Sequence, residues 1–369
     1  MSPRDIVREA LPAAVLALTC VGLWFVPAPG RLADDTGRTV RAEVVETDES
    51  GLRRLGLLDY GTQRLTVRLP DGTSRTAMNE LRAQMELDKR FRAGDTALVV
   101  LPADDDGVSP LVARDHWRLG WAFALFAAFC VLLCAFGGFT GAKALFSFVF
   151  SCFAVWKLLI PLCLRGWPAS LVAFLTVAVL TAVIMYLVAG PTRKGAVAFA
   201  GSMLGVCASF ALAAAVGRVM RVNGATMPYA QALVNAGCSF LDLGDVFVGA
   251  IVLASSGAVM DLGMDIAAGI AEVKRHNPAL GFRPLFLSGL RMGRAVVGTM
   301  TTTLLLAYSG GYLTLLMMFA AQGTAPLDFL NSTLVSAEIV KTLVGSFGLV
   351  LVAPFTAFAG AALFARADS

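Results

Sequence analysis

The chain has 369 residues, of which 57% are hydrophobic and only 15% are charged, and its formal net charge is +4. A soluble domain carries roughly 25% charged residues, and several apolar runs here exceed the roughly 18 residues that mark a membrane span. Composition therefore excludes a soluble globular protein. It predicts a polytopic membrane protein whose first partner is the lipid bilayer.

The first apolar run, residues 10–29, follows a short segment that carries Arg4 and Arg8. Such a run is either a cleaved signal peptide or a signal anchor that remains as a helix. The apolar stretch is long for a signal peptide, and Asp5 and Glu9 dilute the positive charge ahead of it, which favours the anchor. We therefore assign residues 1–30 to an N-terminal transmembrane helix.

Residues 31–117 have a different pattern, in which polar residues alternate with β-branched residues and leucine. The segments "TVRAEVVETD", "QRLTVRLPDG" and "DTALVVLPAD" are typical of strands punctuated by Asp-Gly and Gly-Asp turns. We predict a small β-barrel or short sandwich of about five strands, with "NELRAQMELDKRFRAGD" as a polar insertion of helical character. Acidic and basic residues are mixed here, so we expect no nucleic-acid partner.

Apolar spans return from Trp117 onward and, with the first run, predict a membrane all-α bundle of about eight transmembrane helices. A small extracytoplasmic β-barrel-like domain at 31–117 separates helix 1 from the helical domain at 118–366, and we find no internal repeat. The seven later spans are expected at residues 118–137, 142–163, 168–190, 195–217, 245–266, 293–320 and 341–365.

Basic residues in the short loops predict the orientation of the chain. The loops on the side of the N-terminus carry Lys143, Arg193, Lys194, Lys274, Arg275 and Arg283, with Arg366 near the C-terminal end. Because cytoplasmic loops are enriched in Lys and Arg, both termini are expected in the cytoplasm and the β-rich domain outside. This orientation fits a multi-pass protein of the bacterial inner (plasma) membrane.

Two carboxylates, Asp261 and Asp265, end an apolar run that starts at Asp245. The 15 uncharged residues between Asp245 and Asp261 span about 22 Å as a helix, which is less than a hydrocarbon core of about 30 Å. If Asp242 or Asp245 is the N-cap at the outer surface, Asp261 lies inside the membrane core. Small residues share its helical stripe, which we expect to face other helices, at Ala250, Ala254 and Gly257.

This stripe has two interpretations that the residues leave open. Asp261 and Asp265 either pair with a nearby basic residue, with Arg294 as the first partner to test, or they form a cation or proton site on a permeation path. In the next span, Arg294 precedes a hydroxyl stripe of Thr299, Thr302 and Thr303. Those threonines either line the path or bond to carbonyls of their own helix.

Two further features lie in the last two spans. Gly310 and Gly311 weaken the helix and favour a break in the outer half of the span. Glu338 is three residues before Lys341, so the two can pair on one face at an exposed helix start. If that helix begins near Ser332, Glu338 lies close to the outer membrane edge and guards an outer mouth.

Motifs of nucleotide binding, zinc hydrolysis and serine catalysis are absent from the sequence, and its seven cysteines show no CxxC spacing. We therefore expect no enzyme, no cofactor and no bound metal.

Three ordered blocks resemble the YibE/F family of bacterial membrane proteins. They are "LDLGDVFVGAIVLASSGAVMDLGMDIA", "GRAVVGTMTTTLLLAYSGG" and "EIVKTLVGSFGLVLVAPFTA", and the match covers most of 117–366. Upstream, one span followed by a β-rich segment ending in "RAGDTALVV" is also similar. Thr302 departs from the asparagine typical of the second block. The resemblance implies the architecture and no substrate, because the family has no established activity. The polar positions within the blocks are Asp245, Asp261, Asp265, Arg294, Thr299, Thr301 and Glu338.

Two functions follow as hypotheses. The leading one is a transporter or channel for an ion or small solute, with a polar path along the last three spans. In it Asp261 and Asp265 bind or relay a cation, Arg294 balances their charge, and the threonines line the path. The rival is an envelope scaffold or assembly protein, whose β-rich domain binds an envelope protein while the helices anchor it and form a homo-oligomer.

Overall fold

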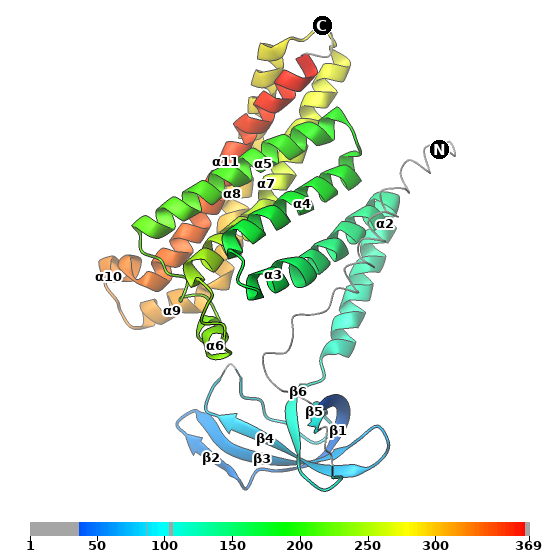
Figure 1. Cartoon of the computed structure of the whole chain (residues 1–369), viewed down its shortest axis with the longest axis vertical. Helices are drawn as coiled ribbons and strands as arrows, with labels where there is room; N and C mark the ends of the chain where they lie inside the picture. The colour runs from blue at the N-terminus through cyan, green and yellow to red at the C-terminus, as the bar shows by residue number, and fades with distance from the viewer. Residues whose placement is uncertain (1–36, 86, 103–105, 366–369) are drawn as a thin grey trace. The chain divides into compact units, whose positions relative to one another are not determined.

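The computed structural model describes residues 37–85, 87–102 and 106–365 (Figure 1). The predicted first span at residues 10–29 lies outside the described residues. The described chain forms two compact units, divided between Leu132 and Leu133. One is a β-barrel with the first part of a helix, and the other is helical.

The barrel forms because five strands close into a ring in the order β1-β5-β6-β4-β3, with β3 pairing back onto β1. Every pair is antiparallel except β4 with β6, which is the strand order of the OB-fold, a five-stranded Greek-key barrel. The prediction of about five strands is confirmed. The short β2 pairs only with β3, as a hairpin. The strands are β1 Arg38–Asp48, β2 Leu52–Leu55, β3 Leu58–Arg68, β4 Ser74–Arg82, β5 Thr96–Leu101 and β6 Leu111–His116.

The predicted helical insertion at 79–95 is wrong. Asn79 belongs to β4, and the described residues after Arg82 form an irregular loop. The buried side-chain amides of Asn79 and Gln63 attach this loop to the barrel and keep it from forming a helix. They donate to the backbone carbonyls of Lys89 at 2.6 Å and Phe91 at 2.8 Å. The fully buried Phe91 ring also anchors the loop in the barrel core. The spacing of polar residues in the sequence does not reveal this burial.

The first helices match the predicted spans closely. In α2 (Leu119–Ala154) the backbone of Gly138 is non-helical, with φ 53° and ψ −130°, at the expected boundary between the spans 118–137 and 142–163. A short π-helical turn, η1 (Val155–Leu159), leads into α3 (Ile160–Leu164), and α4 (Ala169–Ala189) and α5 (Arg193–Val219) follow. The connection to the next span contains α6 (Ala230–Asn235).

The last spans are longer than predicted. The helix α7 runs over Leu243–His276 and α8 over Phe282–Gly311, and α11 covers Thr333–Ala365. Their added turns are amphipathic, so hydropathy alone cut them short, although they bury Ile270 and Leu285 in the bundle core. The short α9 (Leu313–Ala321) and α10 (Pro326–Asn331) lie between α8 and α11.

The predicted break at Gly310–Gly311 is confirmed, since α8 and α9 are bent by 64° directly after that pair. Among the described residues, five helical runs are long and apolar enough to cross a membrane, or six if α8 and α9 form one span. The run Leu119–Leu164 counts once in this total despite Gly138. These helices indicate a membrane protein, and the total of eight spans stays a prediction.

Close helix contacts form the core of the helical unit. The helix α11 packs against α5, α7 and α8 (Figure 1), and glycines let the backbones approach. A side chain at Gly201 of α5 would collide with Thr356 of α11, and one at Gly293 of α8 would meet Ala353. Buried apolar residues, including Val259, Leu262, Leu349 and Val352, fill the centre.

Candidate functional site

One face of α11 carries charged and hydroxyl side chains toward its neighbours. Glu338, Lys341, Thr342 and Gly345 follow at helical spacing and share this face. The Glu338 carboxylate and the Lys341 amine are 2.5 Å apart, and each side chain is only 20% exposed. The Lys341 amine also lies 5.9 Å from the centre of the Phe247 ring of α7. The predicted pairing is confirmed, although the pair is largely buried and does not stand at an exposed helix start.

Three helices meet at Gly345, one turn further along. A β-carbon at this glycine would lie 3.4 Å from Ser255 of α7 and 3.4 Å from the Tyr308 hydroxyl of α8. The absence of a side chain there brings these two residues next to the polar face of α11. Together they form what we call the polar lane, which consists of Ser255, Tyr308, Glu338, Lys341 and Thr342.

Two hydroxyls of the polar lane lack hydrogen-bond partners. The oxygens of Tyr308 and Thr342 are buried and have no partner among the described residues, whereas Ser255 donates to the Ile251 carbonyl at 2.9 Å. A buried hydroxyl left unpaired costs about 1–3 kcal/mol. Such groups are expected where water or an ion is accommodated. The polar lane therefore has the donor and acceptor set of a hydrated path.

The polar lane ends inside the bundle. From Leu243 to Ser255 the helix α7 rises about 18 Å, more than half of a hydrocarbon core of about 30 Å. Beyond Ser255 and Gly345, the buried side chains of Val259, Leu349 and Val352 dominate, together with the Ser209 hydroxyl, which lies against Gly348. Mainly apolar packing therefore follows the polar lane on this side.

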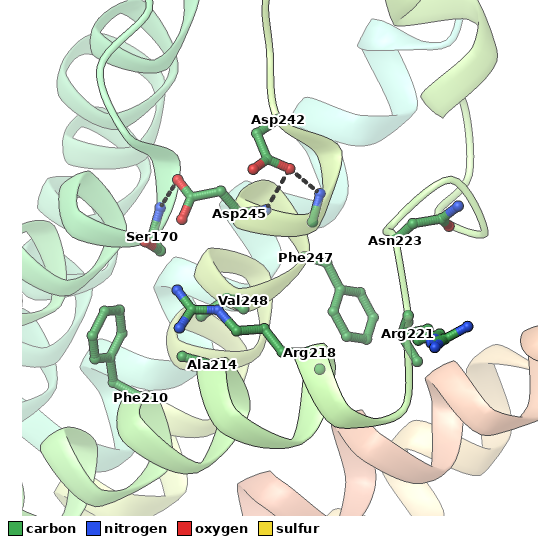
Figure 2. Close-up of a pocket in the computed structure, with 13 residues that line it drawn as sticks. Ser170, Phe210, Ala214, Arg218, Arg221, Asn223, Asp242, Asp245, Phe247 and Val248 are labelled. Atoms are coloured by element: carbon green, nitrogen blue, oxygen red, sulfur yellow. Dashed lines mark hydrogen bonds between the residues drawn. The ribbon is translucent and has the colours of Figure 1, made fainter.

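Asp245 lies at the start of α7, beside a cavity of about 510 Å³ (Figure 2). Asp242 is the N-cap, as predicted, and its carboxylate accepts from the backbone nitrogens of Gly244 at 2.8 Å and Asp245 at 3.3 Å. The Asp245 carboxylate in turn accepts from the Ser170 nitrogen at 3.0 Å, so it binds the first turn of α4. Both carboxylates thus have structural partners.

Basic and aromatic groups line the rest of the cavity. Figure 2 shows the Arg218 guanidinium near Phe210 and Asp245, while the Arg221 guanidinium points away from them. In the described chain no ion pair joins either arginine to Asp242 or Asp245. Phe247 lines the cavity and contacts Lys341 of the polar lane, so the cavity and the lane share this ring.

Asp261 and Asp265 lie elsewhere, on the exposed face of α7. The predicted stripe with Ala250, Ala254 and Gly257 exists, and all five residues are exposed. No ion pair or hydrogen bond joins the two carboxylates to another group among the described residues. Among the described residues no other helix covers this stripe, and the expectation that it faces protein stays a prediction.

Arg294 does not balance these carboxylates within one chain. A side chain at Gly269 of α7 would collide with Met292, so Met292 marks the side of α8 that faces α7. Arg294 follows two residues later, which at 3.6 residues per turn turns it about 160° away. Arg294 was predicted as a partner from its position in the sequence, which does not show the direction in which its side chain points.

The threonines of α8 bond to their own helix. Thr299 donates to the Val296 carbonyl at 2.9 Å and Thr302 to the Gly298 carbonyl at 3.1 Å. Both are exposed, which matches the simpler of the two predicted roles. The structure thus divides the predicted site residues into three places: Asp245 at the cavity, Glu338 in the polar lane, and Asp261, Asp265, Arg294, Thr299 and Thr302 on the exposed faces of α7 and α8.

Tyr308, Thr342 and Ser255 were not predicted from the sequence. The spacing of Glu338, Lys341, Thr342 and Gly345 was the available signal, since it marks one face of α11 that leads away from the charged pair. Tyr308 and Ser255 carry no such pattern of their own. Among the described residues no group of three His, Cys, Asp or Glu side chains could hold a metal ion.

A bundle of long apolar helices with close glycine contacts and a buried polar lane defines a polytopic helical membrane protein. Within this class, the model of the YibE/F-like protein family matches residues 125–366. The chain belongs to the YibE/F family. No curated protein and no solved structure matches the chain.

Proposed function

We propose that this protein is a membrane transporter or channel for an ion or small solute, and not an enzyme. The observation that carries the proposal concerns two of the four buried hydroxyls that have no partner among the described residues: Tyr308 and Thr342 lie beside the largely buried Glu338–Lys341 ion pair. Polar groups inside a membrane bundle are costly and mark substrate or ion pathways. The path runs along the last three long helices, as the sequence predicts, but through the polar lane and not through Asp261 and Asp265.

In this proposal Glu338 attracts a cation and Lys341 neutralises the empty site. A cation or proton that reaches Glu338 competes with the Lys341 amine for the carboxylate. The hydroxyl oxygens of Thr342 and Tyr308 then replace part of the lost hydration. Passage beyond Gly345 requires the apolar contacts of Val259 and Leu349 to separate, so the structure corresponds to a closed state.

The orientation follows from the positive-inside rule. Lys274, Arg275 and Arg283 flank the connection between α7 and α8, which supports a cytoplasmic position for that connection in a bacterial inner membrane. The polar lane then opens toward the outside, on the same side as the β-domain, and both termini are cytoplasmic. The cavity beside Asp245 is its outer vestibule, and the Phe247 ring contacts both.

Flux measurements test the proposal. The purified full chain is reconstituted into proteoliposomes, and gradients of protons, Na⁺, K⁺ and Mg²⁺ are followed in turn. Glu338→Gln is expected to reduce the flux at least tenfold because the lane loses its charge. Asp328→Asn, which changes an acidic residue of α10 outside the lane, is the matched control and should leave the flux unchanged. Equal flux in wild type and Glu338→Gln for every ion that moves would overturn the proposed path.

A second candidate function rests on the barrel. The β2–β3 hairpin exposes Leu55 and Leu57, at 66% and 90%, and exposed apolar side chains of this kind mark interaction sites. This favours the envelope scaffold, in which the hairpin binds an envelope protein. If Leu55→Ser with Leu57→Ser abolished crosslinking to one defined envelope protein, and Glu338→Gln changed no measured flux, the scaffold would replace transport as the function.

A further inference from the structure

The cavity beside Asp245 lies where the ends of three helices meet (Figure 2). Its wall contains Ser170 in the first turn of α4, Gly217 and Arg218 in the last turn of α5, and Asp242 at the start of α7. The ends of membrane-spanning helices lie near the level of the lipid head groups. The cavity volume of about 510 Å³ falls within the roughly 300–1,000 Å³ of small-molecule sites. Its place and its size both suit a ligand at the membrane surface.

Gly217 shows that this cavity is open space inside the helical unit. The residue is buried, yet a β-carbon there would meet no atom within 4 Å. Because protein interiors are close-packed, the open side of Gly217 is the cavity that it lines. Phe210 lines the same cavity eight residues before Arg218, which places it about 12 Å further along α5. With Ala214 and Val248 it makes that end of the cavity apolar, whereas the end at Arg218 is charged.

Charged groups of both signs line the polar end of the cavity without pairing to one another. The Arg218 guanidinium lies near Asp245 (Figure 2), but within the described ranges it has neither an ion pair nor a hydrogen bond. Asp242 uses only Oδ1 and Asp245 only Oδ2 for their bonds to backbone nitrogens. A carboxylate offers about four acceptor positions, so the second oxygen of each one is available to a cationic donor.

We infer that this cavity binds a zwitterion that joins an ammonium to a phosphate group and continues into an apolar part. Arg218 holds the phosphate, because a guanidinium donates two parallel hydrogen bonds to such an oxyanion. The second oxygens of Asp242 and Asp245 accept from the ammonium, and the apolar part lies beside Phe210. A phosphatidylethanolamine lipid and free phosphoethanolamine share this head group, so both are tested. The site does not depend on the transport proposal, because its binding is measured without flux.

Lipid retention by the purified full chain tests this inference. The protein is exposed in detergent to equal amounts of phosphatidylethanolamine, phosphatidylcholine and phosphatidylglycerol, and native mass spectrometry counts the lipids that stay bound. Wild type is expected to retain one phosphatidylethanolamine, in at least tenfold excess over the other two lipids. Phosphatidylcholine carries a trimethylated ammonium that donates no N–H hydrogen bond, and phosphatidylglycerol has no ammonium.

Two variants remove the site in different ways. Arg218→Gln deletes the cation that holds the phosphate, and Gly217→Phe fills the open space of the cavity. Each should lower the retained phosphatidylethanolamine at least tenfold. The matched controls are Arg283→Gln, at an exposed arginine of α8, and Ala215→Phe, on an exposed face of α5. Both controls should retain the lipid as wild type does.

A third variant, Asp245→Asn, tests the role of the carboxylates. It keeps an oxygen that can accept from the Ser170 nitrogen, so the start of α4 stays attached. Its neutral amide no longer favours an ammonium, and the preference for phosphatidylethanolamine over phosphatidylglycerol should disappear.

Free phosphoethanolamine separates the two sources of the head group. Isothermal titration calorimetry of the lipid-stripped full chain measures its binding. Binding that Arg218→Gln abolishes would identify a soluble zwitterion as a ligand, and retention of the lipid alone would show that the apolar part is required; both results support the site. Equal retention of the three lipids without binding of phosphoethanolamine, or binding that both Arg218→Gln and Gly217→Phe leave unchanged, would overturn the inference. The Arg218 side chain would then only extend to the head groups of the surrounding lipid.

Discussion

At the scale of single residues, Asp242 and Asp245 show how carboxylates at the start of α7 serve the fold. Asp242 accepts from two backbone nitrogens of its own helix, and Asp245 accepts from the Ser170 nitrogen of α4. Both therefore satisfy backbone donors that a helix start leaves without intrahelical partners. Their negative charge also complements the helix dipole.

Loss of the N-cap should destabilise the bundle measurably. Asp242→Ala removes the acceptor for Gly244 and Asp245 and is expected to lower the free energy of unfolding by about 0.5–2 kcal/mol. Asp242→Asn keeps an acceptor oxygen and should lose much less. Chemical denaturation in detergent compares the two variants, and an equal loss in both would contradict the capping role.

The carboxylate of Asp106 in the barrel has a strongly lowered pKa. The Ser109 hydroxyl and the backbone nitrogens of Ser109 and Val108 donate to it, and these bonds lower the pKa of Asp106 to about 2. A depressed folded-state pKa stabilises the fold above the unfolded value of about 3.9, and this contribution disappears as the pH falls toward the folded pKa.

The main cause of the shift can be removed. Ser109→Ala deletes the donating hydroxyl, so the pKa of Asp106 should rise toward its ordinary value, and the acid limit of barrel stability should move to higher pH. Carboxyl carbon resonances measured over a pH series report the pKa directly. An unchanged titration of Asp106 in the variant would exclude the hydroxyl as the main cause.

At the scale of helices, glycine decides which pairs pack closely. A β-carbon at Gly201 of α5 would lie 2.7 Å from the Thr356 Cα of α11, which no ordinary contact permits. Near the end of the same helix, a β-carbon at Gly217 would meet nothing within 4 Å. The two glycines have equal helix propensity but opposite packing environments.

This difference predicts opposite effects for the same substitution. Gly201→Ala should destabilise the bundle by about 1–3 kcal/mol through overpacking. Gly217→Ala should be neutral or stabilising by up to about 1 kcal/mol, because alanine is the better helix former. Thermal unfolding in one detergent ranks both variants against wild type. A destabilised Gly217→Ala with an unaffected Gly201→Ala would contradict the assigned packing of α5 on α11.

At this scale the sequence predicted the barrel strands, the break after Gly310–Gly311 and an N-cap at Asp242 or Asp245, of which the structure has Asp242. Local signals carry these features, namely alternation, turn residues and capping chemistry. The ends of α7 and α8 were missed because their added turns mix basic and apolar residues. The burial of Ile270 and Leu285 depends on partners distant in sequence.

At the scale of the whole molecule, the direction of the side chains assigns to different places residues that the sequence analysis had grouped along one path. Asp261 and Asp265 point out of the bundle and Arg294 points away from α7, so these residues do not form one site within the described chain. Glu338, Thr342 and Tyr308 point inward. No local pattern reveals that Ser255 and Tyr308 converge at Gly345, because their approach depends on the packing of three helices.

The central claim is that the polar lane conducts. Thr342→Val exchanges a buried hydroxyl that has no partner in the described part of the chain for a methyl group of similar size, so the fold should be retained or stabilised by about 1 kcal/mol. Thr356→Val makes the same exchange at another partnerless buried hydroxyl, one that lies outside the lane at the contact of α5 with α11.

Ion flux in proteoliposomes, measured side by side for wild type, Thr342→Val and Thr356→Val, tests the claim most directly. The account predicts at least a tenfold lower flux for Thr342→Val and an unchanged flux for Thr356→Val, with both proteins folded. Wild-type flux in Thr342→Val, or an equal loss in both variants, would contradict a path through the polar lane.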